Sequence, residues 1–328
     1  MEAALGQEAT APMGSSLAYD RGNGRLSGAR LAQKLAVLAL QAGSAVTQPF
    51  GHRGYRLGCR IVASAFAARD IVVRLNSDAL FSVPFADGYW SRLLNRRYDY
   101  EEEIEAFLKG ASDIDYVFVD CGANFGYWSV IASSAPFGSH HALAIEASSA
   151  NAARLELNAR LNGDRFRCIH AAVGGTSGGY VRITGARHEA FGTASIGARE
   201  EGAVRTVSLD ALMTEGAIDI TRAVVVKLDV EGVEIEALQG AENLLAGDAV
   251  FICEEHGADR EHRVSRHLMG ATSLRLYVFD VATSRFVRVQ DLSVLDRIKR
   301  HAWVGYNVFA TASALWAERL ERIGGGPS

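Results

Sequence analysis

The sequence is poor in the patterns that mark metal, redox and export functions. Its four cysteines (Cys59, Cys121, Cys168 and Cys253) form no C-x-x-C pair and have no ligand-like spacing with histidine. This argues against zinc, and small buried thiols in a reducing compartment are a simpler interpretation than redox groups. The N-terminus also lacks a basic stretch followed by an apolar run, so we expect no signal peptide and a cytoplasmic location.

Clusters of positive charge are also scarce. The chain of 328 residues has 34 Lys and Arg against 38 Asp and Glu, a net charge of -4. The nearest basic cluster, Arg96 with Arg97, is followed by the acidic run 99–103. Polyanion binding usually appears as clustered Lys and Arg, so we expect no nucleic-acid partner.

No apolar run approaches the roughly 20 residues of a membrane span. The most apolar helical stretch is 31–46, LAQKLAVLALQAGSAV, which Lys34, two glutamines and a glycine interrupt. Two interpretations stay open: a helix that lies on its own domain, which the single lysine favours, and a helix on a membrane surface, giving peripheral contact.

The chain divides into four parts by composition. Residues 1–28 are rich in glycine, serine and alanine without an apolar period, which predicts a disordered tail. Residues 29–97 form an extension with the apolar helix and a β-hairpin over 70–85, where Pro84 indicates an edge strand. A main domain at 98–315 and a C-terminal tail at 316–328 complete the division.

Strands and helices alternate through the main domain. This predicts an α/β fold with a seven-stranded, mostly parallel sheet covered by helices on both faces, and a late antiparallel pair. The expected strands are 116–120, 142–146, 166–173, 223–229, 249–254, 274–279 and 306–310, and the expected helices are 127–134, 149–162, 233–246 and 261–269. Residues 174–222 interrupt this rhythm and read as an insertion beside the ligand crevice.

The stretch 117–128, VFVDCGANFGYW, reads as a buried strand, a tight glycine turn and a helix start. Its G-x-x-x-G spacing differs from the dinucleotide fingerprint G-x-G-x-x-G, and no phosphate-binding G-x-x-x-x-G-K-[ST] occurs. Asp120 opens the turn, and the turn contains no Lys or Arg. A carboxylate at this position disfavours a pyrophosphate, so a cationic cofactor is indicated.

Acidic residues follow several of the expected strands. Because parallel strands end at one edge of a sheet, these side chains should form an acidic rim around the glycine turn. S-adenosylmethionine fits such a rim, since its sulfonium and ammonium groups favour carboxylates and its ribose hydroxyls suit an acid after the second strand. The residues concerned are Asp120, Glu146, Asp229, Glu231, Glu254 and Glu255.

Six ordered motifs carry a resemblance to a known family. VFVDCGANFGYWS, AIEASSANAARLELNARLNG, HAAVGG, TVSLDAL, VVVKLDVEGVEIEALQGAENLL and FICEEHG resemble an FkbM-type methyltransferase. This family comprises S-adenosylmethionine-dependent O-methyltransferases with the Rossmann-like methyltransferase fold. The likeness runs over 98–310, and 227–234, KLDVEGVE, is its most distinctive part. Cys121 departs mildly from the aliphatic residue that is usual there.

The resemblance implies roles for residues at matching positions. The cofactor's methionine part would lie against Asp120, Gly122, Asn124 and Gly126, with Tyr100 and Glu101 reaching in from the preceding helix. Glu146 would take the ribose, and Ala171 and Ala172 would line the adenine. Asp229 and Glu231 would face the methyl group and the acceptor, and Glu254 with His256 matches the acid-x-His after the fifth strand.

An alcohol acceptor gains from a base within hydrogen-bond reach. We expect Asp229 or His256 to be that base, with Glu254 orienting the histidine. His188 in the insertion is a weaker candidate. A divalent metal bridging Asp229, Glu231 and Glu254 is an alternative, since oxygen ligands suit Mg²⁺, but we expect none.

Two other classes of function stay open at this point. One is an NAD(P)-dependent oxidoreductase on a similar sheet, which the missing fingerprint disfavours. The other is a catalytically silent member that only binds a ligand. The resemblance implies a sugar, glycan or secondary-metabolite hydroxyl as acceptor, and the loop sequences select none of them.

Overall fold

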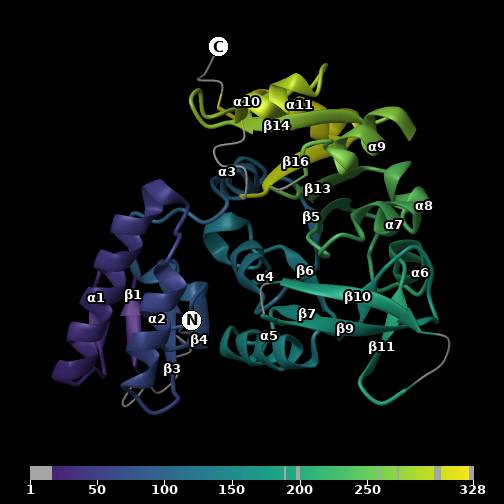
Figure 1. Ribbon diagram of the computed structural model, residues 1–328. Helices are drawn as coiled ribbons and strands as arrows, with labels where there is room; N and C mark the ends of the chain where they lie inside the picture. Colours follow the sequence, from purple (N-terminus) through teal and green to yellow (C-terminus); the bar gives the residue numbers. More distant parts are fainter. Residues whose placement is uncertain are drawn as a thin grey trace, which may run out of the picture. The chain divides into compact units, whose positions relative to one another are not determined.

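A mostly parallel sheet of eight strands organises the larger part of the chain, as seen in a computed structural model (Figure 1). The structure describes residues 17–187, 190–196, 200–257, 259–271, 273–298 and 304–324. The chain folds into two units, one of residues 1–74 and 83–98 and one of residues 75–82 and 99–328.

The first unit carries a small sheet and a helical hairpin. Its sheet has the order β2-β1-β3-β4, so Pro84 lies on an edge strand, as predicted. The helix α1 packs against α2 and against the 3₁₀ helix η2. The elements are β1 (Ala18–Asp20), β2 (Leu26–Ser27), α1 (Leu31–Thr47), η1 (Gln48–Phe50), α2 (Tyr55–Ser64), β3 (Asp70–Arg74), β4 (Leu80–Pro84) and η2 (Trp90–Leu94). Among the described residues, no helix combines the length and apolar character needed to cross a membrane.

The large sheet of the second unit has the order β15-β14-β16-β13-β12-β5-β6-β7. The strands β13, β12, β5, β6 and β7 are parallel, whereas β16, β14 and β15 pair antiparallel. The bounds are β5 (Tyr116–Cys121), β6 (His141–Glu146), β7 (Phe166–His170), β12 (Ala223–Leu228), β13 (Ala249–Glu255), β14 (Arg275–Asp280), β15 (Arg285–Arg288) and β16 (Tyr306–Thr311). The predicted α/β fold is therefore confirmed.

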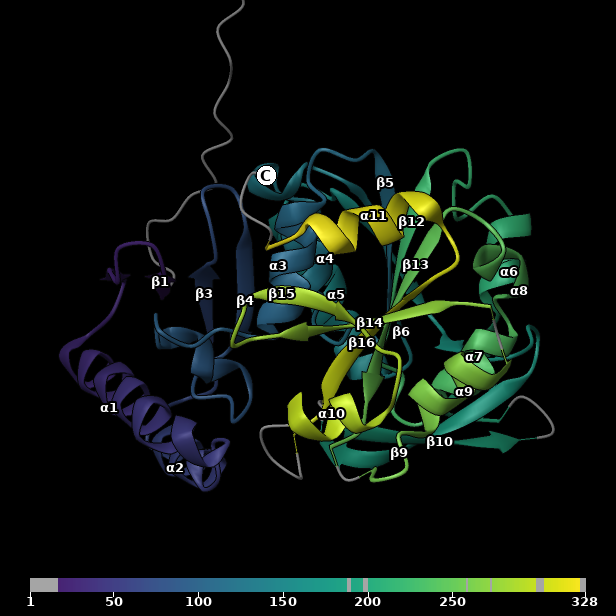
Figure 2. The same ribbon diagram turned by 90° about the horizontal axis from the view of Figure 1, so that it is seen from above.

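Helices cover both faces of this sheet (Figure 2). On one side lie α3 (Glu102–Gly110), α4 (Tyr127–Ala132) and α5 (Ser149–Leu161), and on the other α7 (Glu234–Gln239), α8 (Glu242–Leu245) and α9 (Arg263–Ala271). This unit also contains the helices η3 (Ala135–Phe137), α10 (Ser293–Ile298) and α11 (Ala314–Arg322). The alternation along β5 explains this burial, since Val117, Val119 and Cys121 join the apolar cluster that includes α7, α8 and α9.

The insertion forms a second sheet in the order β10-β9-β11-β8. Its elements are β8 (Ala172–Val173), β9 (Tyr180–Arg187), β10 (Ala190–Ile196), β11 (Ala203–Val207) and the helix α6 (Leu209–Thr214). The stretch expected as one strand at 166–173 breaks at Ala171, whose backbone N–H donates to Glu146 O at 3.1 Å. The chain then passes into the second sheet through β8.

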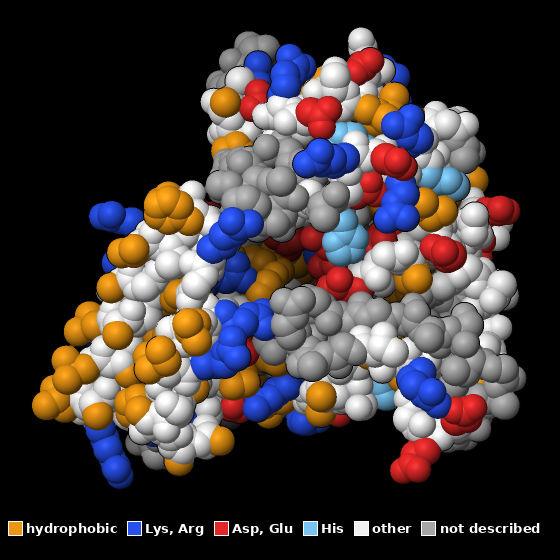
Figure 3. Space-filling view, in the orientation of Figure 1, with side chains coloured by type: hydrophobic (Ala, Val, Ile, Leu, Met, Phe, Trp, Pro, Cys, Tyr) orange, Lys and Arg blue, Asp and Glu red, His pale blue; other side chains and the backbone are white. Residues whose placement is uncertain are grey.

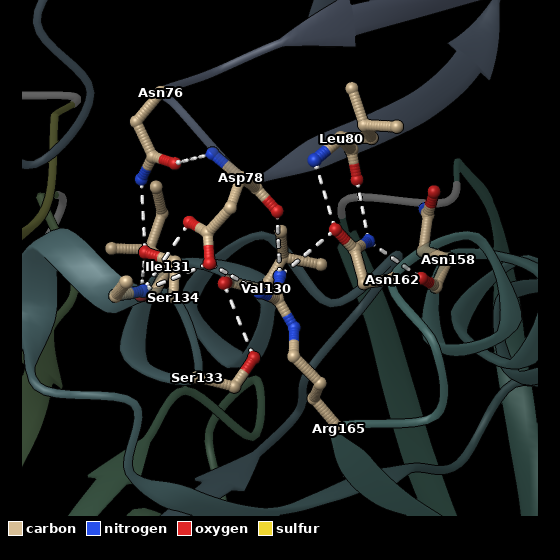
Figure 4. A network of polar contacts seen from close by, with 11 residues as sticks. Asn76, Asp78, Leu80, Val130, Ile131, Ser133, Ser134, Asn158, Asn162 and Arg165 are labelled. Carbon is tan, nitrogen blue, oxygen red and sulfur yellow. Dashed lines mark hydrogen bonds and ion pairs between the residues drawn. The ribbon is translucent and has the colours of Figure 1, made fainter. Parts of the chain in front are cut away.

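Polar side chains from and beyond α5 hold the start of β4 (Figure 4). The amide of Asn162 accepts from Leu80 N at 2.9 Å and donates to Leu80 O at 2.7 Å, as a neighbouring strand would. Arg165 donates to Asp78 Oδ2 at 2.6 Å and to Asp78 O at 2.9 Å. These bonds fix the turn before β4 against the helix that follows Glu146.

Three expectations about the chain's organisation need correction. Residues 17–28 are not a tail, because β1 pairs in parallel with β3 and Tyr19 is buried. Residues 316–322 are likewise helical, and the side chain of Trp316 is fully buried. The sheet has an eighth strand, β15, whose four residues bury only Phe286 and give little apolar signal in the sequence.

Candidate active site

The glycine turn after β5 forms as the sequence predicts. Gly122, Asn124 and Gly126 all have left-handed backbone conformations, with φ of 78°, 53° and 87°. The backbone N–H groups of Gly122 and Ala123 both donate to Ile145 O, at 2.9 and 3.0 Å. Glycine adopts this conformation without steric cost, so the turn can close onto the neighbouring strand β6.

Gly122 is also required by packing. A Cβ at this position would lie 1.8 Å from the backbone oxygen of Asp229. The turns after β5 and β12 therefore approach each other more closely than any side chain permits, and this contact brings Asp229 next to the glycine turn.

Asp120 is the last polar residue of β5 before the turn and is 1% exposed. Its Oδ2 accepts from Ser129 Oγ of α4 at 2.7 Å. Burial raises the pKa of Asp120, while the Lys227 ammonium and the Ser129 hydrogen bond act in the opposite direction. Asp120 therefore lies inside the site wall and contributes negative charge through the Lys227 network.

Glu146 ends β6, as expected, and is 6% exposed. Its two carboxylate oxygens accept from different backbone groups, Oε2 from Asn124 N at 2.8 Å and Oε1 from Ser148 N at 2.7 Å. Burial raises the pKa of Glu146 to about 7, although these backbone bonds lower it. Three backbone N–H groups, those of Ser148, Asn124 and Ala147, thus act on this carboxylate, and its remaining acceptor capacity can receive a hydroxyl group.

A largely buried network of alternating charge lies at the carboxyl ends of β12 and β13. Lys227 is 2% exposed, and its Nζ lies 2.8 Å from Asp229 Oδ2. Burial by itself lowers the pKa of Lys227, but the carboxylates of Asp229, Glu101 and Asp120 outweigh it and raise this pKa well above the ordinary value. The four groups form one electrostatic unit in which carboxylates outnumber the ammonium.

Glu254 is bound into the same network through Asp229. The two carboxyl groups share a hydrogen bond, and burial with the Asp229 charge raises the pKa of Glu254 well above its ordinary range. Burial also acts to raise the pKa of Asp229, but Lys227 and this hydrogen bond lower it overall. A proton shared by this pair therefore resides preferentially on Glu254, and Asp229 is the more acidic partner.

Glu101 reaches the site from the start of α3, with a φ of 47°. Its carboxylate accepts from Trp128 Nε1 of α4 and, at 3.2 Å, from Asn307 Nδ2 of β16. The ring of Tyr100 stacks on Trp128 with centroids 5.9 Å apart. These contacts bring an aromatic wall and a carboxylate beside the glycine turn, in addition to the acids that follow the strands.

Glu254 was predicted to orient His256, but the structure places a different carboxylate beside the histidine. The carboxylate beside His256 is that of Glu231, whose Oε2 lies 4.0 Å from His256 Nε2. The side chains of His256 and Glu231 are 45% and 29% exposed. Adjacent residues of a strand point to opposite faces, but beyond the strand end the sequence does not show which acid will face the histidine.

The other predicted site residues lie outside the charged network or outside the described residues. Ala171 and Ala172 are buried where β7 passes into β8, next to the strand that ends at Glu146. Glu255 is buried and accepts from Ser265 N and Oγ of α9, at 2.9 and 2.6 Å, which ties it to the core. His188 lies outside the described residues.

Sequence reasoning missed three members of the network: Lys227, Trp128 and Asn307. The sequence did contain a signal for Lys227. A lysine inside an apolar strand needs a buried partner, and in an extended chain its side chain points to the same side as that of Asp229, two residues later. Asn307 had none, since its strand β16 is remote in sequence from Glu101. Within the described part of the chain, no three His, Cys, Asp or Glu side chains gather in a way that could hold a metal ion.

Comparison with solved structures gives methyltransferases at low similarity. Methyltransferase FkbM from Methylobacillus flagellatus KT is 15% identical, with 61% of this chain and 44% of that chain covered and a TM-score of 0.39. Precorrin-6y C5,15-methyltransferase from Geobacter metallireducens GS-15 is 10% identical, with 66% and 91% covered and a TM-score of 0.36. An rRNA methylase from Streptococcus thermophilus is 12% identical, with 66% and 98% covered and a TM-score of 0.36. This chain spans less than half of the first of these proteins.

Sequence comparison is more specific. No curated protein matches the chain. Residues 120–278, however, match the family described as methyltransferase FkbM domain, from the glycine turn through to β14. Residues 120–278 of this chain therefore match an FkbM methyltransferase domain.

Proposed function

We propose that this methyltransferase uses S-adenosylmethionine to methylate a hydroxyl group of a sugar, glycan or secondary metabolite. One observation carries the proposal: beside the glycine turn, the buried ammonium of Lys227 lies 2.8 Å from Asp229, and the charges of Asp120 and Glu101 also act on it. Carboxylates in excess over a buried ammonium leave a local negative field. That field favours a cationic cofactor and disfavours a phosphate.

The residues at the turn fit the parts of this cofactor. The turn 122–126 would hold its amino-acid part, with Glu101 supplying a carboxylate and the buried Asp120 acting on it through Lys227. Glu146 would accept from a ribose hydroxyl with the acceptor capacity that its backbone bonds leave open. Ala172 belongs to the apolar surface next to Glu146 and would border the adenine.

The acceptor hydroxyl must lose a proton as the new bond forms. When bound, the cofactor supplies an electrophilic methyl group that an oxygen can attack in line. Asp229 is a weak base, because Lys227 and Glu254 lower its pKa, and the carboxyl of Glu254 is engaged in a hydrogen bond with Asp229. We therefore assign the base to His256, whose imidazole is partly exposed and has its Nε2 4.0 Å from Glu231 Oε2.

Cofactor identity can be tested without knowing the acceptor. S-adenosylhomocysteine should raise the melting temperature of the full chain, whereas NADH should leave it unchanged. Stabilisation by NADH alone would contradict the proposal. The control is the Gly122→Ala chain, in which the collision with Asp229 should remove the response.

The acceptor can then be sought with a methyl label. Extracts and glycan fractions are incubated with labelled S-adenosylmethionine, and mass spectrometry identifies the labelled product. With that product in hand, His256→Gln should lower turnover about 100-fold or more while cofactor affinity changes little. Glu231→Gln should have a smaller effect in the same direction. Unchanged turnover in His256→Gln would show that His256 is not the base.

A further inference from the structure

The helical hairpin of the first unit exposes more apolar surface than a soluble protein normally leaves in water. Twelve large hydrophobic side chains are exposed among the described residues, and seven of them lie between positions 31 and 61. We call these seven the apolar face: Leu31, Leu35, Leu38, Val46, Phe50, Leu57 and Ile61. Figure 3 shows hydrophobic side chains gathered over α1 and α2. Such a gathering usually marks an interaction surface.

The helix α1 is apolar on opposite sides. Ala36, Val37 and Leu40 are buried within the first unit, whereas Leu35 and Leu38 are each 59% exposed. A helix at the surface of a soluble domain usually carries charged residues opposite its buried stripe. Here leucines occupy that side, so the exposed side of α1 is suited to a second apolar environment.

The second helix extends this surface. Leu57 and Ile61 are four residues apart in α2 and are 59% and 65% exposed. Phe50 in the connecting η1 is 64% exposed. Residues four apart share one face of a helix, so each helix presents its own row of apolar side chains.

The charge of this segment identifies its partner. Residues 21–69 contain eight of the 34 Lys and Arg and none of the 38 Asp and Glu. The rest of the chain has 26 basic residues against 38 acidic ones. Lys34, Arg53 and Arg60 are exposed on the hairpin itself. Exposed leucines with a purely cationic border are the features of helices that lie on anionic lipid surfaces.

We propose that the α1–α2 hairpin binds the surface of an anionic lipid bilayer, with the apolar face entering the interface and Lys34, Arg53 and Arg60 contacting lipid headgroups. A second copy of the chain fits this face less well, because a symmetric dimer would bring two purely cationic segments together. This inference is independent of the proposed methyl transfer.

Vesicle flotation with the full chain tests the proposal. The chain should float with phosphatidylcholine vesicles that contain about one-third phosphatidylglycerol, and much less with phosphatidylcholine alone. Salt should weaken the anionic binding. No flotation with the anionic vesicles would overturn the proposal.

Matched variants separate the apolar and the charged contributions. Leu35→Glu with Leu38→Glu should weaken anionic-vesicle binding about 30-fold or more, while Ile220→Glu, at a side chain 56% exposed in the second unit, should leave it unchanged. Lys34→Glu with Arg60→Glu should weaken it about 20-fold or more. The control for that charge change is Arg167→Glu with Arg205→Glu, both exposed in the second unit.

Two results would contradict the assignment. Equal loss of binding in the control variants would show that net charge, and not the hairpin, governs attachment. A concentration-dependent dimer that Leu35→Glu with Leu38→Glu dissociates, found without vesicle binding, would assign the apolar face to self-association. Light scattering on the same samples distinguishes this second result from lipid binding.

Discussion

The site at the strand ends and the apolar face of the α1–α2 hairpin recognise their partners by different physical means. The site buries its charges, with Asp120 and Lys227 almost inaccessible to water and each held by a specific partner. The apolar face leaves large hydrophobic side chains in solvent and borders them with exposed cations. Fixed buried charges select a small ligand by geometry, whereas exposed apolar side chains suit an extended surface without fixed contacts.

The two regions differ in how strongly their charged side chains depend on their neighbours. Burying Lys227 and Asp120 removes two charges from water, and pairing with each other and with the partly exposed Asp229 and Glu101 offsets that loss. The hairpin bears no such constraint, because its cations remain hydrated. Substitutions in the site should therefore have large effects that depend on the neighbouring residues, and substitutions on the apolar face should have small effects on folding.

The largest effect is expected at the contact between the two strand-end turns. Gly122→Ala would place a Cβ 1.8 Å from Asp229 O, and this backbone has little freedom to move away. We expect the variant to lose about 3 kcal/mol or more of unfolding free energy and its cofactor binding. Thermal unfolding and calorimetric titration with S-adenosylhomocysteine measure both losses.

Gly163→Ala provides the matched control. Gly163 also has a positive φ, 68°, but no atom lies within 4 Å of its Cβ position. Its loss should be about 1 kcal/mol, the cost of the backbone conformation alone. Equal losses in the two variants would show that the Gly122 collision relaxes easily.

The next effect concerns the negative field of the site. S-adenosylmethionine and S-adenosylhomocysteine differ by a methyl group and a sulfonium charge, so comparing them isolates electrostatic recognition. Asp229→Asn should weaken binding of the charged cofactor about tenfold more than that of the neutral product. Asp219→Asn, at an exposed carboxylate, is the control. Equal weakening of both ligands would mean that Asp229 acts by packing.

A smaller effect should follow the titration of Glu146. Its pKa is raised from 4.5 to about 7, chiefly by burial. The folded chain therefore binds this proton more tightly than the unfolded chain, and the associated stability falls as the pH rises from about 4.5 toward 7. If the ionised carboxylate receives a ribose hydroxyl, S-adenosylhomocysteine affinity should rise about tenfold between about pH 6 and pH 8.

Glu146→Gln should flatten that rise, because the amide does not titrate. Glu103, whose pKa burial also raises to about 7, provides the comparison through Glu103→Gln. A pH dependence that persists in Glu146→Gln and disappears in Glu103→Gln would show that Glu103 in α3, and not Glu146, is the group whose titration changes the affinity.

Much of the fold followed from local pattern. Six of the seven expected strands occur as single strands, because most are apolar runs with clear polar or glycine boundaries, whereas the stretch 166–173 divides into β7 and β8. The eighth strand could not be predicted, since β15 takes its stability from pairing with β14. The N-terminal strand β1 was missed for the same reason: its partner β3 lies about 50 residues further on, and no local period marks such a pairing.

The sequence predicted which edge of the sheet carries the acidic residues, but not which side chain each of them contacts. Strand ends placed Asp120, Glu146 and Asp229 at one edge, since parallel strands share that edge. The partner of each acid depends on side-chain direction, which the sequence leaves undetermined. Glu254 accordingly meets Asp229, and Glu231 lies beside His256. For the same reason, the sequence could not decide between a packed and an exposed side for the leucines of α1.

The smallest expected effect tests whether the two regions act separately. Leu35→Glu with Leu38→Glu replaces side chains that are each 59% exposed, so it removes little packing from the folded state. We expect the melting temperature to shift by less than about 2 °C and S-adenosylhomocysteine affinity to stay within about twofold, even as vesicle binding is lost. A large fall in cofactor affinity, with the fold intact by circular dichroism, would show that the apolar face and the strand-end site are coupled. Lipid binding at the apolar face and cofactor binding at the strand-end site would then be thermodynamically coupled. Vesicles added to the unsubstituted chain should in that case change its cofactor affinity by a similar factor.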